Sequence, residues 1–259
     1  MIFTPCAANR RTKGIKSVLS LTETNARLIA KMFHRPLTVV HNSTNSLPVD
    51  ILESAVGKAW RWMTEPARVA YPFLLEALKD RSKERVIVVC HSQGTIITAN
   101  LMRALDKARF RRWLFSRDAG ASPEQADRPV PRLPRKKRLA KLEVYAFANC
   151  ADQMTYAARP TCSKRDQRVP WIENFANEFD SVARLGMLAR GEAAQGIQID
   201  GDRYVRKGAW GHLLNQHYLF PILDHLSQPG GEEPFPASGG SGGGPRLYEY
   251  FAGGRPPAY

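Results

Sequence analysis

Short runs of apolar and β-branched residues alternate along the chain with longer stretches in which apolar residues recur every three or four positions. The short runs are bounded by polar or turn-forming residues, a pattern typical of buried strands. They predict five strands, at residues 36–42, 86–90, 142–149, 169–176 and 197–209, the last either a single strand or a hairpin.

The longer stretches predict helices, because apolar residues at this spacing fall on one helical face. The predicted helices lie at residues 21–33, 50–79, 94–105 and 212–227, and we expect Pro66 and Pro72 to split the second and Pro221 to interrupt the last. Strands that alternate with helices predict an α/β fold, with a mostly parallel sheet of about five strands and helices on both faces.

Three segments fall outside this pattern. Residues 1–20 are basic and hold no acidic residue, residues 106–140 are dense in Arg, Lys and Pro, and residues 228–259 are rich in Gly and Pro. We therefore expect a basic N-terminal segment, one domain over residues 21–227 with a basic insertion, and a flexible tail that cannot bury a core.

Polar residues follow four of the predicted strands, at their carboxyl ends. They are His41 to Thr44, Ser92, Asn177 to Asp180, and His212. In a parallel sheet these ends meet at one edge, which is where open α/β folds bind ligands. The sequence therefore predicts a functional site at this edge of the sheet.

Ser92 lies in CHSQG, between the strand-like VIVV and the helix-like TIITANLM. A sharp turn from strand to helix exposes a serine hydroxyl at its apex and needs small residues two positions before and after the serine. Here these are Cys90 and Gly94, which fits a nucleophilic serine, although Cys stands where Gly is usual. The alternative is a serine that only caps the helix.

A nucleophilic serine requires a histidine base and an acid that orients the base. Adjacent side chains at the apex of the turn point apart, which excludes His91 and leaves His212 as the favoured base, with His217 as the alternative. Asp180, after the fourth strand, is the favoured acid, and Asp152, after the third strand, is the alternative.

An acyl-transfer site also needs donors for an oxyanion, usually two backbone amides. We expect the first donor at Gln93, and the second near Asn42 and Ser43 if their strand lies beside the strand that leads to Ser92. The alternative for this second segment is an Asx or Ser/Thr turn without a catalytic role.

The order Ser, Asp, His resembles that of the α/β-hydrolase superfamily. The segments VVHNSTNSLPVD, CHSQG, ENFANEFDSVARLG and WGHLLNQHYL are similar, over about residues 20–227, to uncharacterised fungal lipase-like (DUF676-like) serine hydrolases. The resemblance implies Ser92 as nucleophile, Asp180 as acid and His212 as base. It also implies an abbreviated α/β-hydrolase fold, because the first predicted strand comes only at residue 36.

The net charge of +14 favours anionic partners. In the basic insertion, aromatic and cationic residues are interleaved, at the place where hydrolases of this fold carry lids. We expect the insertion to hold the protein on an anionic membrane surface, with a solvated loop as an equal alternative. No nucleic-acid motif accompanies it, so we expect no nucleic-acid partner. The cationic and aromatic residues of the insertion are Arg109, Phe110, Arg111, Arg112, Trp113, Phe115, Arg135, Lys136, Lys137 and Arg138.

The cysteines and the apolar runs limit the remaining classes. The four cysteines are far apart and lack paired metal-ligand spacing, which favours free thiols in a reducing compartment and predicts no metal or other cofactor. No run is long and apolar enough for a transmembrane helix, and the N-terminus lacks the apolar core of a signal peptide. We expect a cytoplasmic protein, with a mitochondrial presequence as the alternative.

These candidates lead to two functions. The first is a serine hydrolase that cleaves a carboxylic ester, preferably a lipid-like one, through an acyl-enzyme. The second is a catalytically inactive hydrolase fold that binds an anionic membrane, nucleic acid or a protein through its basic insertion.

Overall fold

The computed structural model describes residues 2–7, 14–44, 64–116, 122–126, 139–156, 170–228, 230–237 and 244–257. At its centre is a six-stranded sheet in the order β2-β1-β3-β4-β6-β8, in which neighbouring strands are parallel. These strands are β1 (Ile2–Ala7), β2 (Val39–Thr44), β3 (Val86–His91), β4 (Leu142–Phe147), β6 (Trp171–Asn177) and β8 (Asp202–Arg206). The predicted α/β class, with a mostly parallel sheet, is confirmed.

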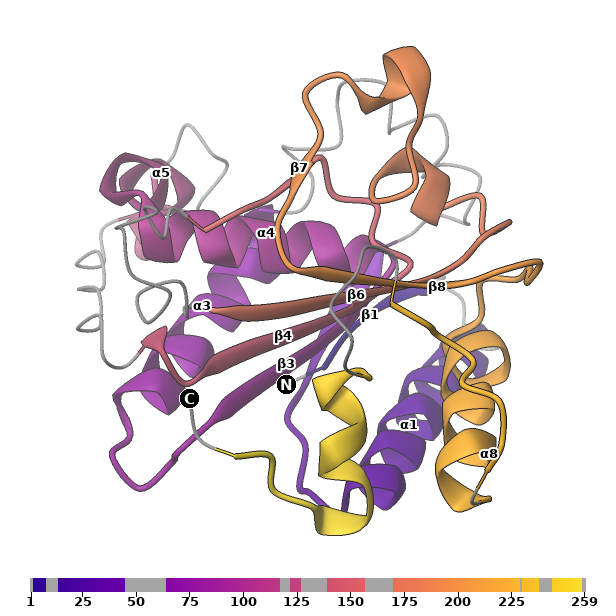
Figure 1. Ribbon diagram of the computed structural model, residues 1–259. Coiled ribbons are helices and arrows are strands. Elements are labelled where there is room, and N and C mark those ends of the chain that lie inside the picture. The colour runs from indigo at the N-terminus through magenta and orange to yellow at the C-terminus, as the bar shows by residue number, and fades with distance from the viewer. Residues whose placement is uncertain are drawn as a thin grey trace, which may run out of the picture.

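Helices cover both faces of the sheet (Figure 1). Helices α3 (Thr64–Lys79) and α4 (Gln93–Asp106) lie on one face, and α1 (Gly14–Phe33) lies on the other, beside α8 (Phe220–Ser227). None of the described helices combines the length and the apolar character that crossing a bilayer requires. The shorter helical segments are α5 (Ala108–Leu114), α6 (Pro123–Ala126), η2 (Ala183–Leu185), η3 (Gly191–Ala194), the π-helical η4 (Leu214–Leu219) and η5 (Arg246–Gly253).

A row of aromatic rings crosses the sheet and holds the strands that carry the site. Phe147, Phe175 and Tyr204 come from β4, β6 and β8, and the parallel register sets them side by side. The ring centroids are 4.9 Å apart for Phe147 and Phe175, and 5.2 Å apart for Phe175 and Tyr204. Tyr218 and Phe235 pack on this row from the segments that follow β8. The carboxyl ends of these strands are thereby fixed relative to one another.

The N-terminal segment differs from the prediction. Residues 2–7 form β1, which lies between β2 and β3, and α1 begins at Gly14. The sheet therefore has six strands rather than about five, and the N-terminal residues are part of the domain. Pro5 has no N–H to donate, so a strand that contains it is locally disfavoured at the centre of a sheet. β1 pairs with β3 only at Ile2 and Phe3, so Pro5 is paired with β2 alone and its missing N–H interrupts no bond to β3.

One proline that was expected to split a helix, Pro72, does not do so, whereas the residues before Thr64 that would test a split near Pro66 lie outside the described part of the chain. Helix α3 begins at Thr64 and continues through Pro66 and Pro72. Pro66 lies in the first turn, where the amide has no intrahelical partner, and Pro72 removes one intrahelical bond. The buried side chains of Tyr71 and Leu74 hold the helix against the core. The earlier part of this predicted helix, at residues 50–63, lies outside the described residues, and Pro221 stands where π-helical η4 gives way to α8.

The fifth predicted strand divides into two, and they do not form a hairpin. β7 (Gln198–Ile199) pairs in parallel with β5 (Gln153–Met154) in a separate small sheet, whereas β8 joins the main sheet. Gly201 lies between them with a φ of +92°, and a Cβ at this position would lie 2.2 Å from the carbonyl oxygen of Ile172. Close backbone approach therefore requires glycine in this turn.

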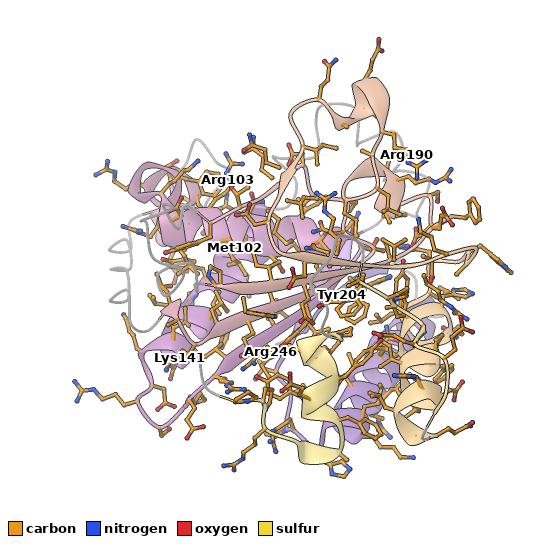
Figure 2. All side chains as sticks on the ribbon, viewed as in Figure 1. Met102, Arg103, Lys141, Arg190, Tyr204 and Arg246 are labelled. Atoms are coloured by element: carbon orange, nitrogen blue, oxygen red, sulfur yellow. The ribbon has the colours of Figure 1, made fainter. Side chains whose placement is uncertain are left out.

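The C-terminal part of the chain also differs from the prediction of a flexible tail. Phe235 is fully buried, and η5 packs Leu247 and Tyr250 into the hydrophobic core. Figure 2 shows Arg246 between η5 and the sheet. The content of Gly and Pro suggested a segment without a core, but a few large side chains are enough to attach it to the domain.

Two glutamates in β4 and β6 anchor this C-terminal segment. Arg246 Nε lies 3.4 Å from Glu143 Oε1, and the hydroxyl of Tyr250 donates to Glu143 Oε2 at 2.7 Å. Glu173 accepts the backbone amides of Arg246 at 2.7 Å and Leu247 at 3.2 Å. Burial raises the pKa of the Glu173 carboxyl to about 7. These carboxyl groups therefore lie where backbone amides, a guanidinium and a hydroxyl of the C-terminal segment meet the sheet.

Candidate active site

Ser92 lies at the turn between β3 and α4, and its backbone is strained. Its φ of 56° and ψ of −127° lie outside the regions that residues other than glycine ordinarily adopt. The Ser92 amide donates to the carbonyl oxygen of Phe147 at 3.0 Å, and the Thr95 amide donates to that of Ser92 at 2.8 Å. The Ser92 side chain makes no hydrogen bond that caps α4, so the alternative of a capping serine is not supported.

Cys90 occupies the close contact between the strand and the helix of this turn. It is completely buried, and its Sγ lies 3.8 Å from the carbonyl oxygen of Tyr145. Burial raises the pKa of its thiol to about 12, which keeps the thiol protonated and unreactive. Thr98 donates to the carbonyl oxygen of Gly94 at 2.8 Å on the facing side of α4. A small, inert cysteine is therefore accommodated where the turn more often has glycine.

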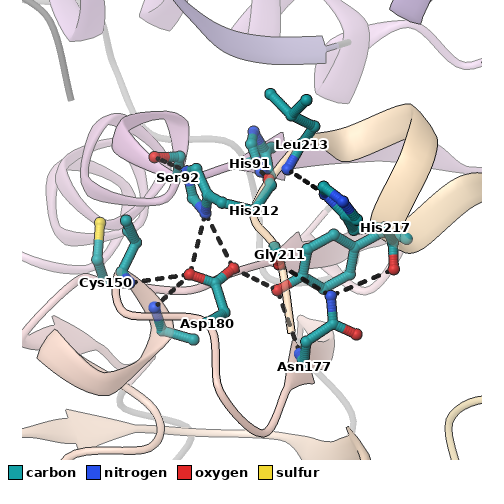
Figure 3. Close-up of polar contacts among 12 residues, drawn as sticks. His91, Ser92, Cys150, Asn177, Asp180, Gly211, His212, Leu213 and His217 are labelled. Carbon is teal, nitrogen blue, oxygen red and sulfur yellow. Dashed lines mark hydrogen bonds and ion pairs between the residues drawn. The ribbon is translucent and has the colours of Figure 1, made fainter. Parts of the chain in front are cut away.

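The structure brings Ser92, His212 and Asp180 into one chain of hydrogen bonds (Figure 3). Ser92 Oγ lies 2.9 Å from His212 Nε2, and His212 Nδ1 lies 2.9 Å from Asp180 Oδ2 and 3.1 Å from Asp180 Oδ1. With the proton on Nδ1, His212 donates to the carboxylate and accepts from the Ser92 hydroxyl. Ser92 and Asp180 are buried, and His212 is the member of the three that solvent reaches.

Several donors hold the Asp180 carboxylate in place. The Val182 amide donates to Oδ1 at 2.8 Å, and the hydroxyl of Tyr218 donates to Oδ2 at 2.6 Å. Burial opposes ionisation of Asp180, but the hydrogen bond and positive field of His212, with the donors from Tyr218 and Val182, outweigh it and lower the pKa of this carboxyl. Asp180 is therefore an anion that faces the Nδ1 side of His212.

The loop that carries His212 is tied to the end of β6. Asn177 Nδ2 donates to the carbonyl oxygens of Gly211, at 3.0 Å, and His217, at 3.2 Å. Gly211 has a φ of +97°, and a Cβ there would lie 2.5 Å from the ring of His217. The backbone amide of Asn177 donates to the hydroxyl of Tyr218 at 3.2 Å. These contacts set the backbone position from which the His212 ring reaches Ser92.

His91 packs against His212 without contacting the Ser92 hydroxyl. The two imidazole centroids are 4.6 Å apart, and His91 Nε2 donates to the carbonyl oxygen of His212 at 2.7 Å. Burial, and then the positive field of His212, lower the pKa of His91 to about 3. His91 is thus a neutral ring that supports His212, in agreement with its exclusion as a base.

The alternative base and acid lie elsewhere. His217 Nδ1 accepts the Leu213 amide at 2.9 Å, and its ring lies against Trp210 at 5.7 Å between centroids. The carbonyl oxygen of Asp152 accepts the Gln198 amide at 2.6 Å, which places Asp152 beside β7. The carboxylate that contacts the His212 ring is that of Asp180, not that of Asp152. Tyr218 and the bridging role of Asn177 were not predicted, because no sequence spacing relates them to His212.

Of the two segments predicted to stabilise an oxyanion, only the one at Gln93 lies next to Ser92. Gln93 is the first residue of α4, so its amide lies at the positive end of the helix dipole, next to Ser92. Asn42 and Ser43 lie within β2, in register with Pro5 and Cys6 of β1. Because β1 separates β2 from β3, the condition for a donor at Asn42 or Ser43 is not met.

The basic insertion is described only in part. Residues 108–114 and 123–126 form the short helices α5 and α6, and the guanidinium of Arg103 lies 4.4 Å from the centre of the Phe110 ring. Arg135, Lys136, Lys137 and Arg138 lie outside the described residues. Among the described residues, no group of three or more His, Cys, Asp or Glu side chains is arranged to hold a metal ion.

The chain matches no known family model, no curated protein and no solved structure. The fold and the site therefore define it only as an α/β protein with a parallel sheet and a hydrogen-bonded Ser, His and Asp at the carboxyl ends of its strands. Any narrower class has to be argued from this site.

Proposed function

We propose that the protein is a serine hydrolase of the α/β-hydrolase type that cleaves carboxylic esters through an acyl-enzyme. The observation that carries this proposal is the chain of hydrogen bonds from the strained Ser92 through His212 to Asp180, with distances of 2.9 Å at both junctions. Nucleophile, base and orienting acid in this relation form the machinery of serine acyl transfer on several unrelated folds.

In the first half of the reaction, His212 Nε2 takes the proton of Ser92 Oγ as the oxygen attacks the ester carbonyl carbon. The carbonyl oxygen becomes an oxyanion, which the Gln93 amide at the start of α4 is placed to stabilise. When the C–O bond to the leaving group breaks, the alcohol takes the proton from Nε2, and the acyl group stays on Ser92.

In the second half, His212 Nε2 removes a proton from water, which attacks the acyl carbon, and Nε2 returns that proton to Ser92 Oγ as the C–Oγ bond breaks and the carboxylic acid leaves. Asp180, whose pKa is lowered, remains ionised and stabilises the imidazolium in both halves. The residues that supply these steps follow the ends of β3, β6 and β8. We favour lipid-like esters as substrates.

The test is labelling of the full chain with a fluorophosphonate probe, followed by hydrolysis of p-nitrophenyl butyrate. We expect the wild type to be labelled at Ser92 and Ser92→Ala to lose both labelling and at least about a thousandfold of kcat/KM. The matched control is Ser181→Ala, which removes an exposed hydroxyl next to Asp180 and should change neither readout.

Absence of labelling in folded wild type, or labelling that survives Ser92→Ala, contradicts the proposal. Circular dichroism establishes that each variant is folded. Absence of labelling, or labelling that does not depend on Ser92, would instead favour a hydrolase-like fold that only binds its partner. The variants His212→Ala and His217→Ala separate the two candidate bases, because loss of turnover in His217→Ala alone would contradict the assignment of His212.

A further inference from the structure

Three large apolar side chains are exposed on the two loops that carry Asp180 and His212. Phe179 is 53% exposed, Trp210 is 74% exposed and Leu213 is 48% exposed. Phe179 directly precedes Asp180, and Trp210 and Leu213 flank Gly211 and His212 in the chain. Large apolar residues are scattered singly on most surfaces, so three beside one site call for an explanation.

The three side chains belong to one surface because the loops are held together. The Phe179 amide donates to the carbonyl oxygen of Ala209 at 2.9 Å, which joins the loop after β6 to the loop after β8. Trp210 and Leu213 both contact His217, the first through its ring and the second through its amide. We call Phe179, Trp210 and Leu213 the rim surface.

Basic side chains border the rim surface. The guanidinium of Arg184 lies 5.3 Å from the centre of the Phe179 ring, and Lys207 Nζ lies 3.6 Å from Glu178 Oε1. The hydrogen bond from the Gly208 amide lowers the pKa of the Glu178 carboxyl most, and the charges of Lys207 and of Arg190, which is labelled in Figure 2, lower it further. Lys207 and Arg190 thus act on the Glu178 carboxylate, and Arg184 Nε donates to the Glu178 backbone carbonyl at 3.2 Å. We call Arg184, Arg190 and Lys207 the basic border.

Apolar rings with a basic border match an anionic lipid surface. Trp and Phe insert into the interface between headgroups and acyl chains, while Arg and Lys remain at the level of the phosphates. A second copy of this chain fits less well, because two molecules of charge +14 would bring their basic borders together. The hydrogen bond between Phe179 and Ala209 keeps the two loops that carry these exposed side chains together.

We infer that the rim surface and the basic border dock the protein on anionic phospholipid membranes, with the Ser92 site facing the bilayer. That the lipid then supplies the ester rests on the proposed function, whereas docking itself does not. Docking through these loops places the acyl chains of the membrane next to His212, the solvent-accessible member of the site.

The test measures vesicle binding of the full chain in a Ser92→Ala background, so that no lipid is hydrolysed. Phosphatidylcholine vesicles with and without phosphatidylglycerol are sedimented with the protein. We expect binding that requires phosphatidylglycerol and weakens with salt. Trp210→Ala and Phe179→Ala should each reduce the partition coefficient about tenfold, because each removes an aromatic ring from the interface. Lys207→Glu should reduce it by at least about fivefold.

The matched control is Phe73→Ala on α3, which removes a side chain that is 51% exposed but lies outside the rim surface. It should leave the partition coefficient unchanged. Quenching of tryptophan fluorescence by brominated lipids gives a second readout. The variant Trp210→Phe keeps an aromatic ring but removes this tryptophan, so the quenching that is lost in this variant reports insertion of Trp210.

Binding that is unchanged in Trp210→Ala and Phe179→Ala, or equally reduced in Phe73→Ala, overturns the inference. Absence of binding to vesicles that contain phosphatidylglycerol overturns it as well. These outcomes leave fluorophosphonate labelling of Ser92 untouched, so a failure of docking and a failure of the proposed function are distinguishable.

Discussion

At the scale of single residues, the Asp180 carboxylate shows how buried polar groups can orient His212, the proposed base. A buried anion is destabilised unless donors surround it. Tyr218, Val182 and His212 supply those donors within 2.9 Å. The same hydrogen bonds fix the plane of the carboxylate, and through it the tautomer and direction of His212. Tyr218 is therefore a positioning residue that acts on His212 through Asp180.

Replacement of Tyr218 tests this role. Tyr218→Phe removes the donor to Asp180 Oδ2, so the pKa of Asp180 should rise from its lowered value. We expect kcat/KM for p-nitrophenyl butyrate to fall about tenfold or more, as for loss of a hydrogen bond to a charged group. The acid limb of the pH profile should move to higher pH.

The control is Tyr204→Phe, since Tyr204 is a buried tyrosine of the same aromatic row that stacks on Phe175. It should lower stability at most and leave the pH profile in place. An acid limb that stays unchanged in Tyr218→Phe would show that Tyr218 is only a packing residue.

At the scale of elements, the connection from β8 to η4 positions His212, the proposed base. It contains two glycines with positive φ, Gly208 at +66° and Gly211 at +97°. Gly208 has open space where a Cβ would be, whereas a Cβ at Gly211 would meet the His217 ring. That ring is held by the Leu213 amide, and the Gly211 carbonyl is held by Asn177. Gly211 therefore lets this segment turn tightly next to His212.

The two glycines form a matched pair for experiment. Both Gly208→Ala and Gly211→Ala place an alanine at positive φ, which costs about 1 to 2 kcal/mol. Only Gly211→Ala also forces the His217 ring aside, so we expect it to lose about a hundredfold in kcat, as a displacement of about 1 Å at a catalytic group can do.

Thermal unfolding should show destabilisation of both variants, the larger for Gly211→Ala, and kinetics with p-nitrophenyl butyrate should show a loss of kcat in Gly211→Ala alone. Equal kcat values in both would refute the role of this turn in placing His212. The comparison is independent of the substrate that the protein uses in the cell.

At the scale of the whole molecule, the C-terminal segment is joined to the sheet by buried carboxyl groups. Glu143 and Glu173 lie in adjacent strands and contact η5 through Arg246, Leu247 and Tyr250. This attachment lies away from the carboxyl ends of the strands, where Ser92 sits. It should therefore govern the stability of the domain more than its chemistry.

The pH dependence of stability tests this attachment. The pKa of Glu173 is raised from 4.5 to about 7, so the folded protein binds this proton more tightly than the unfolded chain does. Its stabilising contribution is complete below pH 4.5 and is lost as pH rises through about 7. Relative to Glu173→Gln, the wild type should lose up to about 3 kcal/mol of unfolding free energy across this range.

Urea unfolding at a series of pH values measures the difference between the two proteins. Glu84→Gln, at an exposed position before β3, is the control and should run parallel to the wild type. If the curve for Glu173→Gln also runs parallel to that of the wild type, Glu173 does not titrate in this range.

Much of the candidate site could be predicted because it depends on local pattern and chain order. Ser92, Asp180 and His212 each follow a strand that its own residues specify, and parallel strands bring their carboxyl ends to one edge. Cys90 and Gly94 similarly indicate a close turn. The prediction that helices would cover both faces follows from the alternation of the two periodicities.

The order of the strands, by contrast, is a property of the folded sheet. β1 contains Pro5 and lacks a local strand signal, yet it takes a central position and separates Asn42 and Ser43 from the Ser92 turn. The C-terminal segment looked too rich in Gly and Pro to pack, but it is held by partners some 70 to 110 residues earlier in the chain.

The sequence alone determined which residues can form strands, helices and a tight serine turn, because periodicity and side-chain size act over a few neighbouring positions. Only the tertiary structure decided which strands are neighbours, that Tyr218 and Asn177 support Asp180 and the His212 loop, and that Phe179, Trp210 and Leu213 are exposed on two loops that a hydrogen bond joins. Those relations join distant parts of the chain, and they depend on the packing of the whole sheet.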